Sequence, residues 1–241
     1  MAQPPSAQRL LLKVSGEGFA REGDTGLDTE RVKLLASQLN ELCAAGVQVA
    51  CVIGGGNILR GNQSESLGIA RATADYMGML ATVINGLALS DALESHGVPT
   101  RVMSAIDVHK VCEPFIRRRA LRHLEKGRVV ILVGGLGSPY FTTDTTAAQR
   151  GVELDCDLLL KATMVDGVYD KDPNAHDDAV RLPRLSFDEV LGRQLRVMDQ
   201  TAFTLCREND LPIVVFDMNA PRGLIQAAQG EPIGTLIQNG A

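Results

Sequence analysis

Two lysines stand where apolar strands are expected to end, and they are the side chains of this sequence best suited to chemistry. Lys13 and Lys161 each follow a run of three leucines. An unpaired ammonium group in a buried strand is costly, so each lysine needs an anionic partner. One interpretation is that the two cations clamp a phosphoryl group during transfer, a reaction that needs positioning and charge neutralisation more than a base. The alternative is structural, with each ammonium group reaching the surface or pairing with a carboxylate of the chain.

Glycine-rich segments follow three of the expected strands and could bind anions. They begin at Ser15-Gly16, at Gly54 and at Gly134, and after the third one Thr142 begins a stretch of residues that cap helices. Backbone N–H groups that converge at a helix N-terminus favour phosphate. The alternative is that these are tight turns whose glycines serve packing. The sequence contains neither GxxxxGK[ST] nor GxGxxG, which argues against a P-loop kinase and an ordinary dinucleotide-binding protein.

Strands alternate with helices along the chain, which predicts an α/β fold with a central, largely parallel sheet. In the segment 70–95, we expect Met77, Leu80, Val83, Ile84, Leu87 and Leu93 to form the apolar face of a long helix. The predicted strands are 10–14, 47–53, 98–103, 129–133, 157–161, 213–216 and 235–237. The predicted helices are one that ends at Gly46, then 70–95, 114–126, one that begins at Thr142, 186–191, 199–207 and one near Leu224.

Composition narrows the classes of function. A net charge of −5 over 241 residues argues against non-specific binding to nucleic acid. The five scattered cysteines indicate small core residues in a reducing compartment, so we expect a cytoplasmic protein. No apolar stretch approaching about 18 residues stands out, so we expect no membrane span. Residues 1–8 are predicted to be a disordered leader, and 9–241 a single domain.

Six blocks of the sequence resemble the bacterial uridylate kinases, a branch of the amino acid kinase family. They are LLKVSGE from Leu11, GGGNILRG from Gly54, DYMGMLATVINGLAL from Asp75, SPYFTTDTTAAQRG from Ser138, KATMVDGVYDKDP from Lys161 and VMDQTAF from Val197. The blocks from Gly54 and Asp75 are specific to this branch. Acetylglutamate, aspartate and glutamate kinases share the fold without them.

The resemblance implies a three-layer αβα sandwich that forms a homohexamer and converts ATP and UMP, with Mg²⁺, to ADP and UDP in pyrimidine nucleotide synthesis. By position it implies catalytic roles for Lys13, Lys161, Arg60 and Asp199, with Asp199 orienting the lysines. ATP would contact Lys13, Val14, Ser15, Gly16, Gly56, Arg60, Thr163, Tyr169 and Asp172. UMP would contact Gly55, Asp75, Leu136, Gly137, Ser138, Pro139, Tyr140, Phe141, Thr142 and Thr143. No residue of the chain is assigned as a metal ligand.

Some alternatives stay open from the sequence. Asp75 could accept hydrogen bonds from the ribose hydroxyls or merely cap the helix that follows, and Tyr169 could simply be packed in a turn. Leu136 and Ser138 stand where the family usually has Thr and Asn. A non-catalytic nucleotide sensor and a kinase of a carboxylate substrate are the competing functions. The lysine pair speaks against the first, and Asp75 against the second, because a carboxylate repels an acidic substrate.

Overall fold

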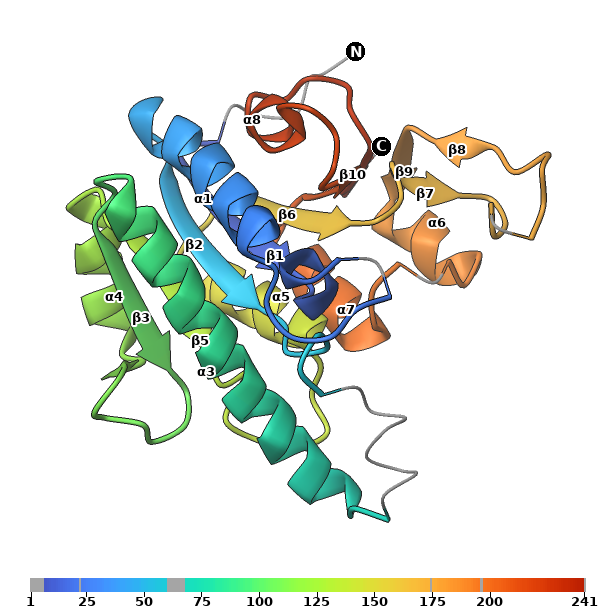
Figure 1. The fold of residues 1–241 in the computed structure, drawn as a ribbon. Coiled ribbons are helices and arrows are strands. Elements are labelled where there is room, and N and C mark those ends of the chain that lie inside the picture. Colours follow the sequence, from blue (N-terminus) through green and yellow to red (C-terminus); the bar gives the residue numbers. More distant parts are fainter. Residues whose placement is uncertain (1–6, 22, 60–67, 174, 196, 241) are drawn as a thin grey trace.

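The strands at the centre of the structure consist almost entirely of buried aliphatic residues, as expected for strands covered on both faces. In the computed structural model, the described residues are 7–21, 23–59, 68–173, 175–195 and 197–240. They form a nine-stranded sheet in the order β4-β3-β5-β2-β1-β6-β10-β11-β9 (Figure 1). The central strands are β1 (Arg9–Val14), β2 (Gln48–Ile53), β3 (Thr100–Ser104), β5 (Val129–Val133) and β6 (Leu158–Thr163), all parallel to their neighbours.

The remaining strands are short or lie toward one edge of the sheet. They are β4 (Glu113–Pro114), β9 (Arg184–Ser186), β10 (Ile213–Asp217) and β11 (Thr235–Gln238) in the main sheet, and β7 (Val168–Tyr169) paired with β8 (Arg181–Leu182) in a separate hairpin. Within the described residues, β10 and β11 form the one antiparallel pair of the main sheet, and β9 runs parallel to β11. The prediction of a mostly parallel sheet is therefore confirmed, although β4, β7, β8 and β9 were too short to be recognised from the sequence.

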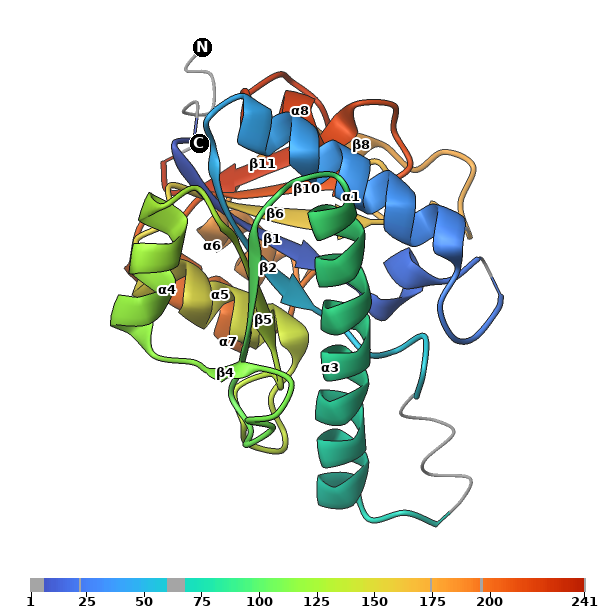
Figure 2. The same cartoon turned by 60° about the vertical axis from the view of Figure 1, so that its left-hand side comes forward.

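Helices cover both faces of the sheet and enclose two separate cores (Figure 2). One core contains residues of α1 (Thr29–Ala44), α3 (Arg71–Ser95) and α8 (Gly223–Ala228). The other contains residues of α4 (Arg117–Glu125), α5 (Thr143–Glu153), α6 (Phe187–Gly192) and α7 (Gln200–Glu208). A short 3₁₀ helix, Gly16–Phe19, follows β1. This arrangement is the predicted αβα sandwich.

Several predicted boundaries need correction. The helix predicted over 114–126 begins only at Arg117, because Glu113–Pro114 pairs with β3 as an edge strand. The folded part of the chain also begins before residue 9. Ala7 is buried and donates its N–H to the carbonyl of Ala228, and the Gln8 N–H donates to Asp157, so these two residues do not belong to a disordered leader.

The predicted apolar face of α3 is only partly right, and Leu87 packs against the core as expected. Val83 and Leu93 are buried, but Met77, Leu80 and Ile84 are 37%, 49% and 49% exposed. A different face of the helix packs on the sheet, because Gly86 allows a close approach: a Cβ there would lie 2.4 Å from Cγ1 of Val133. By length and composition alone α3 is apolar enough to cross a membrane, a test that the core helices of folded domains also pass. Its buried side rests against β3 and β5, as the core helix of a folded domain does.

The glycines of α3 provide a test of this packing. Gly86→Ala should lower the free energy of unfolding by about 1–3 kcal/mol, the usual cost of overpacking. The matched control is Gly78→Ala in the same helix, where a Cβ would meet no atom within 4 Å. That change should raise stability by up to about 1 kcal/mol through helix propensity. Denaturant unfolding of both variants measures the difference, and equal stabilities would show that α3 does not approach β5 so closely.

Candidate phosphoryl-transfer site

The two lysines lie side by side at the centre of the sheet. Lys13 of β1 and Lys161 of β6 are paired residues of adjacent parallel strands. Side chains alternate between the faces of a strand, and Leu11 and Leu159, two residues before the lysines, belong to the core beneath α5. Both ammonium groups therefore point to the α5 side. The lysines are only 7% and 8% exposed.

A carboxylate at the start of α5 lies between the two ammonium groups. Thr142 is the N-cap of α5, as predicted, and accepts from the N–H groups of Asp144 and Thr145. Asp144 Oδ1 lies 3.0 Å from Nζ of Lys13, and its Oδ2 accepts a 2.7 Å hydrogen bond from Nζ of Lys161. Lys161 also donates to the carbonyl of Val197. Both lysines thus pair with a carboxylate of the chain, as the structural interpretation of these residues requires. A phosphate group could also occupy this position between them.

Burial and neighbouring charges act in opposite directions on this cluster. Burial by itself raises the pKa of Asp144, but Lys13 and Lys161 outweigh it and hold the pKa below its usual range. For Lys161, burial lowers the pKa, and the opposing attraction of Asp144 does not restore it. The nearby positive charge of Lys13 lowers the pKa of Lys161 further. With both lysines protonated, the cluster holds two cations and one anion, and its excess positive charge favours an anionic ligand.

Within the part of the chain that the structure describes, no hydrogen bond or ion pair joins Asp199 to either lysine. It is the N-cap of α7, where it accepts from the N–H of Ala202, and it also accepts from the hydroxyls of Thr142 and Thr145. The side chain that contacts both lysines is Asp144, which the sequence indicated only as part of the N-terminal turn of α5. Asp199 fixes the start of α5, which carries Asp144, and its negative charge also acts against the lowering of the Lys161 pKa.

The glycine-rich segments meet at the carboxyl ends of the strands, where ligands bind in open α/β sheets. A Cβ on Gly16 would lie 2.3 Å from the backbone nitrogen of Gly56, and one on Gly54 would lie 2.7 Å from the nitrogen of Gly16. Only glycine fits at both positions. The backbones after β1 and β2 therefore touch, which brings Val14, Ser15 and Gly16 next to Gly55 and Gly56. Arg60 lies outside the described residues.

A cavity of about 340 Å³ opens between the start of α3 and the segment after β5. We call it the α3 cavity. Among the residues predicted to bind UMP, those lining it are Gly55, Asp75, Leu136, Phe141, Thr142 and Thr143, and Gly56 lines it as well. Gly137, Ser138, Pro139 and Tyr140 are not among its lining residues. Arg71, Met79 and Thr82 also line it, and no pattern in the sequence pointed to them.

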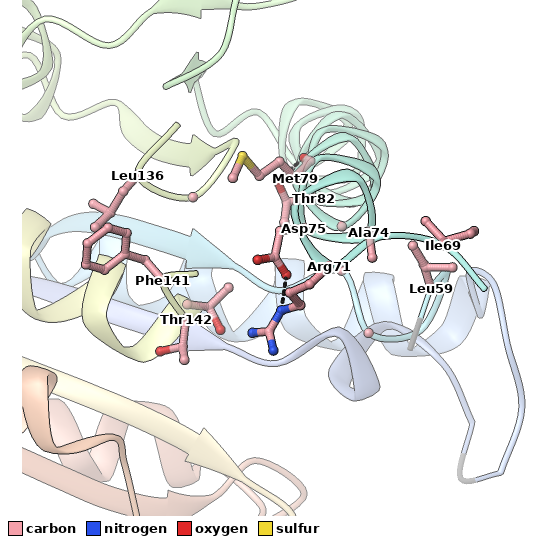
Figure 3. A pocket seen from close by; sticks show the side chains of 15 residues that line it. Leu59, Ile69, Arg71, Ala74, Asp75, Met79, Thr82, Leu136, Phe141 and Thr142 are labelled. Carbon is pink, nitrogen blue, oxygen red and sulfur yellow. Dashed lines mark hydrogen bonds and ion pairs between the residues drawn. The ribbon is translucent and has the colours of Figure 1, made fainter. Parts of the chain in front are cut away.

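Asp75 is already engaged on both oxygens of its carboxylate. Its Oδ1 accepts a 2.9 Å hydrogen bond from Nε of Arg71, as Figure 3 shows, and its Oδ2 accepts a 2.8 Å bond from the N–H of Tyr140. Asp75 is the fifth residue of α3, whose N-cap is Ala70, so Asp75 is not a helix cap. Tyr140 has a φ of 72°, which is unusual outside glycine and aims its N–H at the carboxylate.

A second cavity, of about 540 Å³, lies beyond the end of β6 and contains Thr163, Tyr169 and Asp172 among its lining residues. We call it the β6 cavity. The Tyr169 hydroxyl donates a 2.6 Å hydrogen bond to Asp166, which raises the pKa of the phenol. Since β1 lies between β2 and β6, the lysine cluster sits between the two cavities. The geometry suits a transfer between two anions that approach the cluster from opposite sides.

Removal of the central carboxylate should expose the repulsion between the lysines. We expect Asp144→Asn to lower the free energy of unfolding by about 3–5 kcal/mol, the usual cost of breaking a buried ion pair. Inorganic pyrophosphate should raise the Tm of this variant more than that of the unmodified protein, because the anion takes the place of the carboxylate. The control is Asp155→Asn, whose 2.6 Å ion pair with Arg117 is exposed. It should change stability by less than about 1 kcal/mol. A pyrophosphate response equal to that of the unmodified protein would contradict the prediction.

The chain is similar in sequence and structure to known kinases. The Amino acid kinase family matches residues 8–217. A protein named uridylate kinase from Xanthomonas oryzae pv. oryzae is 55% identical over 233 residues, which cover 97% of each chain. A relative with the same name from Xanthomonas campestris pv. campestris is also 55% identical, with the same coverage.

Solved structures match the whole fold. The crystal structure of UMP kinase from Bacillus anthracis superposes with a TM-score of 0.94 at 38% identity, covering 98% of this chain and 97% of that one. The structure of UMP kinase from Ureaplasma parvum gives a TM-score of 0.92 at 36% identity, covering 96% and 99%. The resemblance seen in the sequence is confirmed, and this chain belongs to the amino acid kinase family, in its uridylate kinase branch.

Proposed function

We propose that the chain transfers the γ-phosphoryl group of ATP to UMP and produces ADP and UDP. The observation that carries this proposal is the Lys13–Asp144–Lys161 cluster, which lies between two cavities of nucleotide size. The β6 cavity would hold the adenosine of ATP through Thr163, Tyr169 and Asp172, and the α3 cavity would hold UMP. The names of the relatives support this choice of substrates. The free thiols of all five cysteines suit an enzyme of the cytoplasm.

In the proposed reaction, a phosphate oxygen of UMP attacks the γ-phosphorus of ATP while the bond to the β–γ bridging oxygen breaks. The attacking oxygen is already anionic, so no general base is required. Lys13 and Lys161 neutralise charge on the transferring group and on the departing ADP. The backbone N–H groups at Ser15-Gly16 and Gly55-Gly56 would hold the phosphates in line. Asp144 keeps the ammonium groups oriented. Part of their positive charge would then interact with the phosphates instead of with the Asp144 carboxylate.

Mg²⁺ would enter with ATP. Among the described residues, no group of three or more His, Cys, Asp or Glu could hold a metal ion by itself. The Asp144 carboxylate is committed to the lysines. This donor set fits a metal held mainly by phosphate oxygens and water, as is common for Mg²⁺. When bound, Mg²⁺ neutralises charge on the β- and γ-phosphates.

Acceptor choice depends on Asp75. Its carboxylate would accept from the two ribose hydroxyls of UMP, which replace the N–H groups of Arg71 and Tyr140. The same negative charge disfavours a carboxylate substrate such as acetylglutamate. ADP formation should be measured in the presence of ATP and Mg²⁺, with UMP, CMP, AMP or acetylglutamate as the acceptor. UMP should give the highest kcat/KM. Faster turnover of CMP or acetylglutamate would overturn the assignment, and binding of UMP without turnover would indicate a sensor.

The variant Asp75→Asn should weaken UMP binding by about 1.5–3 kcal/mol, the range for a hydrogen bond to a charged group. Asn replaces one acceptor oxygen by a donor and cannot accept from two hydroxyls. The affinity for ATP should be unchanged, because ATP occupies the other cavity. Calorimetric titration of both nucleotides measures this split. Normal binding of UMP by the variant would show that Asp75 does not contact ribose.

The lowered pKa of Lys161 predicts an alkaline limit to activity. The side chain is a cation only below its pKa, which lies under the ordinary value of 10.5, so kcat/KM for ATP should fall at a lower pH than 10.5. In Lys161→Arg the guanidinium stays protonated, and the fall should move to higher pH even if the rate is reduced. A pH profile with the same alkaline limb in both proteins would assign it to another group.

We also propose that the chain forms a homohexamer, with α3 at one interface between subunits. Tyr76, Leu80 and Ile84 recur every four residues along α3 and are 47–49% exposed, so they form an apolar stripe on its outer face. Contiguous exposed apolar surface of this kind marks an interaction site more often than scattered residues do.

A charge within the stripe should disrupt assembly. We expect Ile84→Lys to shift the protein to a smaller species in sedimentation velocity, because a lysine in an apolar interface is costly to desolvate. Val180→Lys, at a residue that is 59% exposed near the β7–β8 hairpin, should leave the assembly unchanged. If Ile84→Lys sediments like the unmodified protein, the stripe is not an interface.

A further inference from the structure

The inner side of α3 carries two buried polar side chains that the proposed chemistry does not use. Thr82 and Asn85 are 3% and 0% exposed, and they lie three residues apart on the same side of the helix. Each is hydrogen-bonded to a different glycine-rich segment. A buried polar group is retained at a cost unless its partners are satisfied, so the partners of these two residues indicate what they do.

Thr82 holds the segment that follows β5. Its Oγ1 donates a 2.6 Å hydrogen bond to the carbonyl of Met79 and accepts a 2.7 Å bond from the N–H of Gly134. The hydroxyl proton is thereby used within the helix, and the oxygen anchors the first residue after the strand. Gly134 has a φ of 76°, and a Cβ there would lie 3.0 Å from Oγ of Ser104. The backbone turns sharply at this glycine toward Leu136 and Thr142, which line the α3 cavity.

Asn85 holds the segment that follows β2. Its Nδ2 donates to Oδ1 of Asn57 and to the carbonyl of Gly54, each at 2.7 Å. In return, Nδ2 of Asn57 donates to Oδ1 of Asn85 at 3.0 Å and to the carbonyl of Gly26 at 2.7 Å. All four amide protons of this pair are used. Since the backbone of Gly16 rests on Gly56, the pair also fixes the segment after β1.

We propose that Thr82 and Asn85 are positioning residues that set the distance between the acceptor and the phosphate-binding segments. One rigid helix holds both segments, and its rise of about 1.5 Å per residue fixes the offset between the two attachment points. Thr82 controls the acceptor side, while Asn85 controls the backbone that meets the phosphates of both nucleotides. This inference rests on the proposed function for the identity of the two substrates.

The two residues should have different kinetic signatures. Thr82→Val keeps the shape of the side chain but removes the acceptor for Gly134 N–H. We expect it to raise the KM for UMP at least fivefold and to leave the KM for ATP within twofold. Thr82→Ser, which keeps the hydroxyl, should restore the KM for UMP. Asn85→Asp places an oxygen against the Gly54 carbonyl and Asn57 Oδ1, and should lower kcat/KM for both substrates at least tenfold.

Two further measurements separate positioning from general damage and from direct contact with the acceptor. Leu89→Val removes one methylene group from a fully buried side chain, one turn beyond Asn85. It should lower the Tm without changing either KM. Hydrogen exchange at Gly134 should be faster in Thr82→Val without any nucleotide, because a positioning role precedes binding. If Thr82→Val does not accumulate as folded protein, Thr82→Ala removes the same hydroxyl.

The proposal is overturned if Thr82→Val leaves the KM for UMP unchanged, if it changes both KM values alike, or if Gly134 exchanges as in the unmodified protein. Its failure is distinct from that of the proposed function. Should the unmodified protein prefer an acceptor other than UMP, the same kinetics are measured with that acceptor. A selective change in its KM would then support the positioning role while refuting the substrate assignment.

Discussion

The contact on which the site depends is the carboxylate of Asp144 between the ammonium groups of Lys13 and Lys161. Two adjacent parallel strands place these lysines at paired positions on one face of the sheet, and two cations so close together in a buried setting repel strongly. The N-terminus of α5 supplies the anion that makes the arrangement stable. Hydrogen bonds fix the position of this N-terminus. Thr142 caps α5, and Asp199 at the start of α7 accepts hydrogen bonds from Thr142 and Thr145. A continuous series of polar contacts thus connects the start of α7 to the lysines.

The other constraint is the rigid placement of the glycine-rich segments. Their backbones touch at Gly16 and Gly56, where no side chain fits, and α3 is attached to them through Thr82 and Asn85. Where α3 meets these segments, its inner side carries Thr82, Asn85 and Gly86, which are small or polar. Further along the helix, Leu89 and Leu93 are fully buried, while Tyr76, Leu80 and Ile84 lie on the outer face. This distribution of side chains accounts for both the close approach at Gly86 and the exposed stripe of Tyr76, Leu80 and Ile84.

Much of this could be predicted from the sequence, because it depends on local pattern. Leucine runs and glycines marked the strands and their ends, and Ser186, Thr142 and Asp199 marked helix starts. The lysine pair was found from its position after such runs. Its partner Asp144 was missed, since that contact joins segments far apart in the chain. The face of α3 was predicted wrongly at Met77, Leu80 and Ile84, because hydrophobic spacing does not distinguish the core from an exposed apolar stripe. Short strands such as β9 exist only through their neighbours in the sheet.

The hydrogen bond from the Tyr140 N–H to Asp75 affects how the chain would recognise the ribose of an acceptor. In the free chain, a backbone N–H and a guanidinium already occupy the two oxygens of this carboxylate. An incoming ribose would thus replace two donors of the chain, so the contact gains less than two newly made hydrogen bonds would. Binding of the sugar would then break the hydrogen bond between Tyr140 and Asp75, so that Tyr140 and its neighbours could move. Selection at Asp75 would therefore depend on how well the ribose hydroxyls replace these two donors, and it would be coupled to the position of Tyr140.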